Sequence, residues 1–117
     1  MDLHHHQVLD DLRAPTKALH GAAPEVMKGF GALHQAAMAD GEVSPALKEC
    51  VALAISVVKH CDGCIAYHAK AAAKAGATRG QVAEMIGIAI LMEGGPGTIY
   101  GPRAWEAFVE FEEEATT

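Results

Sequence analysis

The chain has 117 residues, a length typical of one domain, and a formal charge of −6 with its lysines and arginines scattered along the sequence. No basic face results, so we exclude nucleic acid as a partner. Half of the residues are apolar but only 5% are aromatic, and alanine and glycine are abundant. This composition favours one all-α domain over residues 1–117, with five or six closely packed helices.

The sequence also bears on the compartment. No apolar run approaches the ~20 residues that a membrane span needs, and the polar N-terminus lacks the apolar core of a signal peptide. We therefore expect a cytoplasmic protein with no membrane partner. Thiols rest reduced in the cytoplasm, which favours catalytic, redox-sensing or metal-binding cysteines over a structural disulfide.

The first 23 residues carry mixed signals. A few apolar residues predict a short amphipathic helix that ends before Pro15, and they are Val8, Leu9 and Leu12. The histidines before them are expected to form a flexible tail with no role in a site, and they are His4, His5 and His6.

A second helix is predicted to begin at Pro24, which suits the first helical position, and to end at Asp40 and Gly41. Its apolar residues fall on one side and indicate an ordinary packing helix, namely Met27, Phe30, Leu33 and Ala37. The isolated His20 and His34 are interpreted as surface or hydrogen-bonded helix residues outside the site.

Ser44 followed by Pro45 predicts the start of a third helix, which should run to about His60. Residues 50–58 are apolar on almost every side, so this helix should be buried in the subunit core or between subunits. Glu49 lies near its start, on the same face as small residues that would allow another helix to come close.

Cys61, Cys64 and His68 follow directly. If a helix starts at Asp62 or Gly63, Cys64 lies in its first turn, where free N–H groups and the helix dipole lower a thiol pKa. His68 then lies one turn further on the same face, within reach of that proton. The two cysteines are separated by roughly the span of a disulfide, so one could resolve a sulfenic acid on the other.

The fourth helix should stop at Gly76, and Thr78 with Gln81 forms a capping-box pattern that opens a fifth, largely apolar helix. The segment 93–102 is interpreted as a helix break. A last helix then follows, with an apolar side and a solvated face of glutamates.

Glu49, Cys61, Cys64 and His68 have the residue types and spacing of the alkylhydroperoxidase D family in the carboxymuconolactone decarboxylase superfamily, which residues 45–111 resemble. One position differs, because better-known peroxidase members carry a histidine where this chain has Gly63. Those members also have two related helical halves. This chain has room for one, so we expect a homo-oligomer, a trimer or a hexamer.

The resemblance implies an antioxidant peroxidase that reduces small organic hydroperoxides without a bound cofactor. Cys64 would meet the peroxide, Cys61 would resolve it as a redox-active disulfide, and His68 and Glu49 would relay protons. The resemblance also implies an external dithiol reductant, either a lipoyl-carrying or a thioredoxin-like protein.

Other functions use the same residues. A thiol-disulfide oxidoreductase would differ only in substrate access, and a redox sensor or small binding module would form the disulfide without turnover. Decarboxylation belongs to superfamily members that lack the cysteine pair. Structural zinc would need four ligands, and the chain has no second paired-cysteine knuckle.

The helical spacing raises one geometric question. Glu49 lies about 18 Å along a straight helix from Cys61, whereas His68 lies only about 10 Å beyond it. Contact between Glu49 and His68 therefore requires a steep helix crossing, a bend near residues 59 and 60, or a residue from another subunit.

Overall fold

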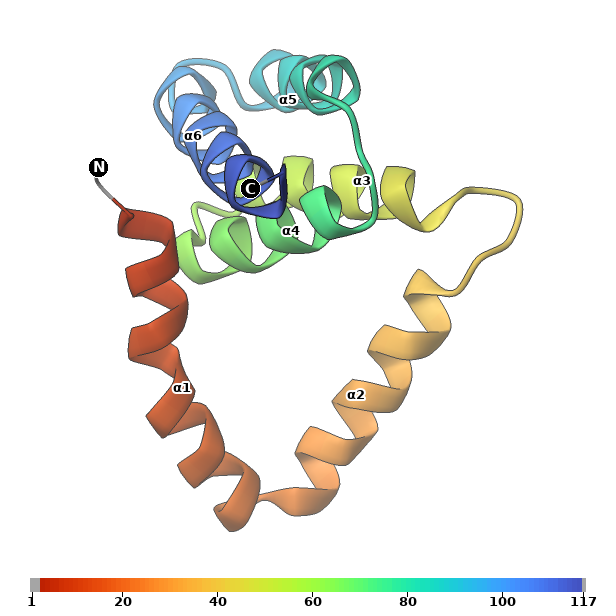
Figure 1. Cartoon of the computed structure of the whole chain (residues 1–117), viewed down its shortest axis with the longest axis vertical. Coiled ribbons are helices and arrows are strands. Elements are labelled where there is room, and N and C mark those ends of the chain that lie inside the picture. Colours follow the sequence, from red (N-terminus) through yellow and green to blue (C-terminus); the bar gives the residue numbers. More distant parts are fainter. Residues whose placement is uncertain (1–2, 117) are drawn as a thin grey trace.

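The computed structural model describes residues 3–116 and confirms the all-α fold (Figure 1). Within these residues there are six helices and no strand. They are α1 (His4–Ala22), α2 (Pro24–Met38), α3 (Pro45–Val58), α4 (Asp62–Lys74), α5 (Arg79–Glu93) and α6 (Gly97–Thr116).

Helices α3 to α6 pack around one hydrophobic core. The largest apolar side chains in it are fully buried, namely Leu53 and Val57 of α3, Ile65 of α4, Val82 of α5 and Phe108 of α6. Alanines fill the space between them, which lets the helices lie close together. The core therefore draws on all four helices and fixes α3 against α4, the pair that carries the predicted site.

Helices α3 and α5 begin with the side-chain caps that the sequence indicates. The Ser44 Oγ accepts the Leu47 N–H at 3.3 Å at the start of α3. At the start of α5 the Thr78 Oγ1 accepts the Gln81 N–H, and the Thr78 N–H donates to the Gln81 Oε1. The predicted capping box is thus confirmed.

The break between α5 and α6 is shorter than predicted. It covers residues 94–96, and α6 begins at Gly97 with Pro102 inside it. A Cβ on Gly97 would lie 2.9 Å from the Ile90 Cα, and one on Gly101 would lie 3.2 Å from Ile90 and Ile86. These glycines allow the first two turns of α6 to press against α5, and this packing continues the helix where the sequence indicated a break.

The N-terminal segment is one long helix, because α1 continues through Pro15 to Ala22. The prediction that it stops before Pro15 was wrong. Proline removes one backbone hydrogen bond, to the carbonyl of Asp11. Residues 10–22 are all exposed, so water can satisfy that carbonyl and the helix can continue.

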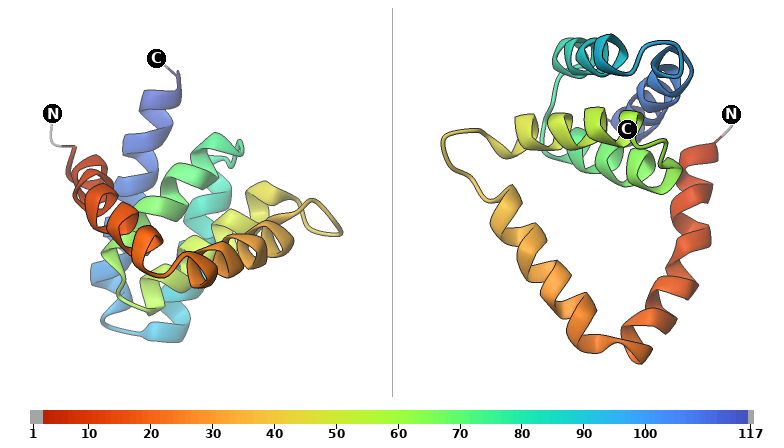
Figure 2. Two further views of the ribbon diagram at one scale, coloured as in Figure 1. Left: turned by 90° about the horizontal axis from the view of Figure 1, so that it is seen from below. Right: turned by 180° about the vertical axis from the view of Figure 1, so that it is seen from behind.

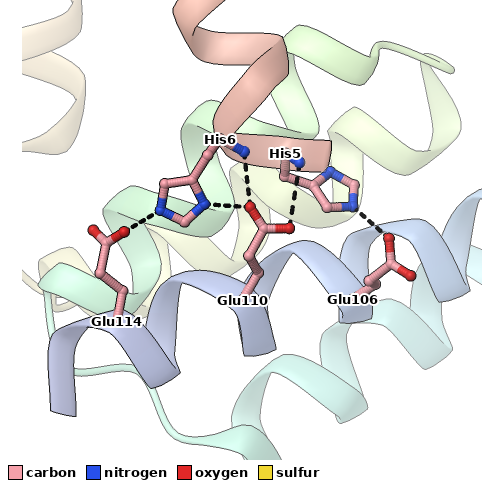
Figure 3. A network of polar contacts seen from close by, with 5 residues as sticks. All are labelled: His5, His6, Glu106, Glu110 and Glu114. Atoms are coloured by element: carbon pink, nitrogen blue, oxygen red, sulfur yellow. Dashed lines mark hydrogen bonds and ion pairs between the residues drawn. The ribbon is translucent and has the colours of Figure 1, made fainter. Parts of the chain in front are cut away.

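The prediction that the histidines form a flexible tail was also wrong. His5 and His6 lie in the first turn of α1 and contact α6 (Figure 3). The His5 Nε2 lies 2.9 Å from a Glu106 oxygen. The His6 ring contacts Glu110 through Nδ1 and Glu114 through Nε2. Three glutamates of the acidic face of α6 thus make intramolecular contacts, but only the side chain of Glu110 is buried, whereas Glu106 and Glu114 remain exposed to solvent.

Glu110 also caps α1. Its two carboxylate oxygens accept the backbone N–H groups of His5, at 3.3 Å, and His6, at 2.7 Å, which have no partner within the helix. Burial opposes the charged forms of the His6 ring and the Glu110 carboxyl group. The Glu110 and Glu114 carboxylates outweigh this effect at His6 and raise its pKa. In turn, hydrogen bonds from His6 outweigh burial and lower the pKa of Glu110.

Helix α2 differs from the ordinary packing helix that the sequence predicts, because none of its residues is buried. With α1 it forms an arm that projects from the core and returns to it (Figure 2). The far end of α2 is fixed by Lys48, whose Nζ donates to the carbonyls of Ala37 and Ala39 at 3.0 and 2.6 Å. Its apolar side, which includes Phe30 and Leu33, stays exposed within this chain.

Over the described residues 3–116, no helix is both long and apolar enough to cross a membrane.

Candidate redox site

The turn between α3 and α4 spans only residues 59–61, and its geometry places the first cysteine. The N–H of His60 donates to the Val57 carbonyl at 3.1 Å, and that of Cys61 donates to the Ser56 carbonyl at 3.3 Å. This is the Schellman pattern that ends a helix, with His60 at φ 54° in the left-handed position usually taken by glycine. The Cys61 N–H thus completes the C-terminal cap of α3, and Cys61 is also the N-cap of α4.

Cys61 and Cys64 form a disulfide whose Cα atoms lie 5.2 Å apart. Cys61 is the N-cap of α4, and its Sγ accepts the Cys64 N–H at 3.2 Å. Cys64 lies in the first turn of the helix and is half-buried, so it stands where the helix dipole favours a thiolate. The two predicted cysteines are thus joined at the N-terminus of α4, the end of the helix at which the sequence places them.

Glu49 and His68 meet within one chain. The Glu49 Oε1 lies 2.8 Å from the His68 Nδ1, and the two side chains are only 9% and 19% exposed. The connection of three residues between α3 and α4 brings His68 back to Glu49 near the start of α3. No residue from another subunit is needed for this contact.

Two aromatic rings extend from His68, those of Tyr67 and of His34, and His34 was predicted to lie outside the site. The Tyr67 ring meets the His68 ring edge to face at 5.1 Å, and the His34 ring of α2 meets Tyr67 in the same way at 5.9 Å. The His34 Nε2 is buried without a hydrogen-bond partner among the described residues. Only the tertiary fold brings α2 to this point, so sequence spacing gave no signal for it.

Gly63 lies close to the α1 helix, which favours a residue without a side chain at this position. A Cβ at this position would lie 3.2 Å from the Cδ1 of Leu12 on α1. This distance is a few tenths of an ångström tighter than ordinary contact, so a larger residue would require a small shift of the exposed Leu12 side chain. The α1 helix therefore lies within contact distance of the position between the two cysteines, where better-known peroxidases carry a histidine.

A cluster of polar and aromatic side chains surrounds His60, the residue before Cys61. The His60 ring stacks on Tyr100 at 4.3 Å, and its Nε2 contacts Glu93. The Arg103 guanidinium lies 4.7 Å from the centre of the Tyr100 ring and 3.6 Å from an Asp62 oxygen. These contacts hold His60 in its left-handed conformation and so fix the turn that carries the disulfide.

The remaining cysteine is chemically different from the pair. Cys50 is buried beside Glu49. Burial raises the pKa of its thiol, and the neighbouring Glu49 carboxylate raises it further, so Cys50 stays protonated and inert. Within the part of the chain that the structure describes, no group of three or more His, Cys, Asp or Glu residues is arranged to hold a metal ion.

Comparison with known proteins agrees with this architecture. The sequence profile of the carboxymuconolactone decarboxylase family matches residues 24–108. The chain resembles the crystal structure of apo-lpg0406, a carboxymuconolactone decarboxylase family protein from Legionella pneumophila, with a TM-score of 0.89 and 38% identity. This similarity covers 92% of the present chain and 96% of that one.

Two uncharacterised bacterial proteins are similar in sequence. One, from Cupriavidus necator, is 39% identical over 100 residues, which cover 86% of this chain and 88% of its own length. The other, protein 4 of the cox locus of Paracoccus denitrificans, is 31% identical over 91 residues, which cover 78% and 82%. The profile match, the fold and these relatives together show that the chain belongs to the carboxymuconolactone decarboxylase family.

Proposed function

We propose that this protein is a thiol-dependent peroxidase that reduces small organic hydroperoxides. The observation that carries the proposal is a cysteine pair in the first turn of α4 followed, one turn later, by a histidine held by a buried glutamate. A thiol nucleophile, a resolving thiol, a base and a group that orients the base are the parts that such chemistry requires.

In the proposed first half-reaction, Cys64 is the nucleophile. With its Nδ1 bonded to Glu49, His68 would take the Cys64 proton at Nε2, and the carboxylate would stabilise the resulting imidazolium. The thiolate attacks the terminal peroxide oxygen, so that an S–O bond forms and the O–O bond breaks. The alkoxide leaves with a proton from His68 as an alcohol, and Cys64 becomes a sulfenic acid.

In the second half-reaction, Cys61 resolves that sulfenic acid. Its Sγ attacks the Cys64 sulfur, the S–S bond forms as the S–O bond breaks, and the hydroxide leaves as water with the proton of the Cys61 thiol. The Cα separation of 5.2 Å lies within the usual disulfide range, so closure requires no large backbone movement. An external dithiol, on a lipoyl-carrying or thioredoxin-like protein, would reduce the disulfide and complete the cycle without a bound cofactor.

Trapping the intermediate tests the order of these steps. In Cys61→Ser protein, one equivalent of cumene hydroperoxide should leave a sulfenic acid on Cys64, detectable by dimedone labelling and peptide mass spectrometry. In Cys64→Ser protein the label should be absent. The matched control is Cys50→Ala, which removes the inert thiol and should leave peroxide consumption unchanged.

The same experiment separates peroxidase from oxidoreductase. A Cys64→Ser protein that still consumes peroxide at the wild-type rate would refute the assignment. Slow reaction with peroxide but fast exchange with a small disulfide substrate would instead identify a thiol-disulfide oxidoreductase. A disulfide that forms without catalytic turnover would identify a redox sensor.

A further inference from the structure

The turn that carries the disulfide ends α3 with a left-handed residue, and the same pattern of backbone hydrogen bonds ends α4. There the Gly76 N–H donates to the Ala73 carbonyl at 3.2 Å and the Ala77 N–H donates to the Ala72 carbonyl at 3.0 Å. The left-handed residue of α4 is a glycine, with φ 90°. At the end of α3 it is His60, the one residue other than glycine with a positive φ in the described portion of the chain. A side chain in this conformation is strained, so a histidine here points to a role for its ring.

The ring of His60 contacts α5 and α6, two helices outside the turn. It lies parallel to the Tyr100 ring of α6, with 2° between the planes and 4.3 Å between the ring centres. Its Nε2 contacts the carboxylate of Glu93, the last residue of α5. The Glu93 side chain is only 16% exposed, so solvent screens this contact weakly. The His60 ring therefore ties the turn to both helices.

The residue on the other side of Cys61 is tied to the same aromatic ring. The Arg103 guanidinium lies 4.7 Å from the centre of the Tyr100 ring, and one of its nitrogens lies 3.6 Å from an Asp62 oxygen. Both side chains of this ion pair are about half exposed, so the contacts of His60 form the stronger tie. Through Tyr100, the stack of His60, Tyr100 and Arg103 thus connects the two neighbours of Cys61.

The other cysteine of the pair is positioned by different contacts. Cys64 lies within α4, and Ile65 and Ala66, which follow it, are fully buried in the core. Cys61 lies outside the helix as its N-cap, so its direction depends on the backbone conformation of His60. The stack therefore acts on one thiol of the pair and leaves the other to the helix.

We propose that the stack of His60, Tyr100 and Arg103 positions Cys61 for attack on the Cys64 sulfur. A thiol that is free to move has a low effective concentration at its partner, and a thiol that is held in place has a high one. By keeping the turn left-handed, the stack keeps the Cys61 Sγ at the N-cap of α4, where it accepts the Cys64 N–H. The three residues act through the backbone of the turn and are positioning residues.

The proposal has two parts with different foundations. That Cys61 resolves a sulfenic acid on Cys64 rests on the proposed peroxidase function. That the stack favours closure of the disulfide does not, because any oxidant that closes the Cys61–Cys64 bond brings the same two sulfurs together. The experiments below measure the two parts separately.

Replacing His60 by glycine distinguishes a positioning ring from a passive one. Glycine adopts the left-handed conformation without strain. If the ring were passive, His60→Gly would relieve strain in the turn, and closure of the disulfide would be unchanged or more favourable. If the stack positions Cys61, the same substitution gives the turn more freedom and makes closure less favourable. The two interpretations thus differ in the direction of the change.

Equilibration of the protein with glutathione measures closure without peroxide. In this buffer the Cys61–Cys64 dithiol is oxidised to the disulfide as one glutathione disulfide is reduced to two glutathione thiols. His60→Gly and Tyr100→Leu should each lower the equilibrium constant about 10-fold, which raises the reduction potential of the protein disulfide by about 30 mV. The matched control is Tyr100→Phe, which keeps the stacked ring and should have the wild-type equilibrium constant.

Dimedone labelling during the reaction with cumene hydroperoxide measures resolution. In His60→Gly and Tyr100→Leu, slower attack by Cys61 should leave the Cys64 sulfenic acid available for longer, so more label accumulates on Cys64 than in the wild type. The first step, loss of the Cys64 thiol, should keep its wild-type rate. Tyr100→Phe should be labelled no more than the wild type. Circular dichroism checks folding, and His60→Gly, which introduces no strain, decides the question if Tyr100→Leu does not fold.

Failure of the positioning role and failure of the peroxidase function give different results. A glutathione equilibrium that is unchanged or more favourable in His60→Gly would overturn the positioning role, as would equal shifts in Tyr100→Phe and Tyr100→Leu. A slower first step with an unchanged equilibrium would also overturn it, because the effect would then lie on Cys64. A shifted equilibrium in a protein that does not react with peroxide would support the positioning role and refute the peroxidase function.

Discussion

Replacing Glu49 by glutamine tests the central contact of the redox site with little change in shape. The glutamine carbonyl can still accept a hydrogen bond from the His68 Nδ1 at the position of the present 2.8 Å contact. The substitution removes only the negative charge. We therefore expect the fold and the ring orientation to persist while the charged form of His68 loses its stabilisation.

The size of the effect follows from the burial of the pair. A hydrogen bond that involves a charged group contributes about 1.5–3 kcal/mol, and a neutral one about 0.5–1.5 kcal/mol. Glu49 and His68 are 9% and 19% exposed, so solvent screens the pair weakly and a difference of about 1–2 kcal/mol is expected. If the imidazolium forms in the rate-limiting step, thiol oxidation should slow roughly 5- to 30-fold.

Stopped-flow measurement of thiol loss against cumene hydroperoxide gives this rate. The matched control is Glu42→Gln, on the exposed loop before α3, which should react at the wild-type rate. A Glu49→Gln protein that oxidises as fast as the control would refute the proton-relay role. Loss of folding in Glu49→Gln, seen by circular dichroism, would show that the pair acts in stability instead.

Three further substitutions probe the fold. The pKa of His6 is raised from 6.5, so its contribution to stability is lost as the pH rises above that value; the pKa of Glu110 is lowered from 4.5, so its contribution is lost as the pH falls below that value. The difference in stability between wild type and His6→Ala, measured by urea unfolding, should therefore be largest between pH 4.5 and 6.5. A constant difference from pH 4 to 8 would contradict the coupling. Gly97→Ala places a Cβ 2.9 Å from the Ile90 backbone and should cost about 1–3 kcal/mol of stability, seen as a lower Tm. At Gly87 inside α5 an added Cβ has no atom within 4 Å, so Gly87→Ala should raise stability by about 0.5–1 kcal/mol. Equal effects of the two substitutions on stability would argue against the close packing of α6 on α5.

Local signals in the sequence predicted the start of most helices because their physical cause is local. Ser44 and the pair Thr78 and Gln81 satisfy N–H groups within three residues of themselves, and such contacts form in any context. The spacing of Cys64 and His68 on one helix was likewise predictable. It depends only on α4 beginning near Asp62, as it does.

Features that depend on distant residues could not be predicted in this way. His5 and His6 bind α6, about a hundred positions away, and no neighbouring residue indicates that partner. The start of α6 at Gly97 depends on the absence of a Cβ facing Ile90. Sequence spacing alone left the contact between Glu49 and His68 undecided, because it depends on how the turn at residue 60 directs α4.

The sequence also misjudged α2, because periodicity shows that a helix has an apolar side but not which molecule covers it. Met27, Phe30 and Leu33 have the spacing of a core helix, yet α2 has no buried residue. A helix whose apolar side stays exposed within its own chain and one that packs on the core follow the same pattern.

The most direct test of the proposed peroxidase function is a stopped-flow titration of fully reduced, metal-free protein with cumene hydroperoxide, followed by intact mass and a free-thiol count. We predict rapid loss of two of the three thiols, those of Cys61 and Cys64, at one equivalent of peroxide, with full recovery and turnover on addition of dihydrolipoamide. Retention of all three thiols after excess peroxide would contradict the proposed peroxidase function.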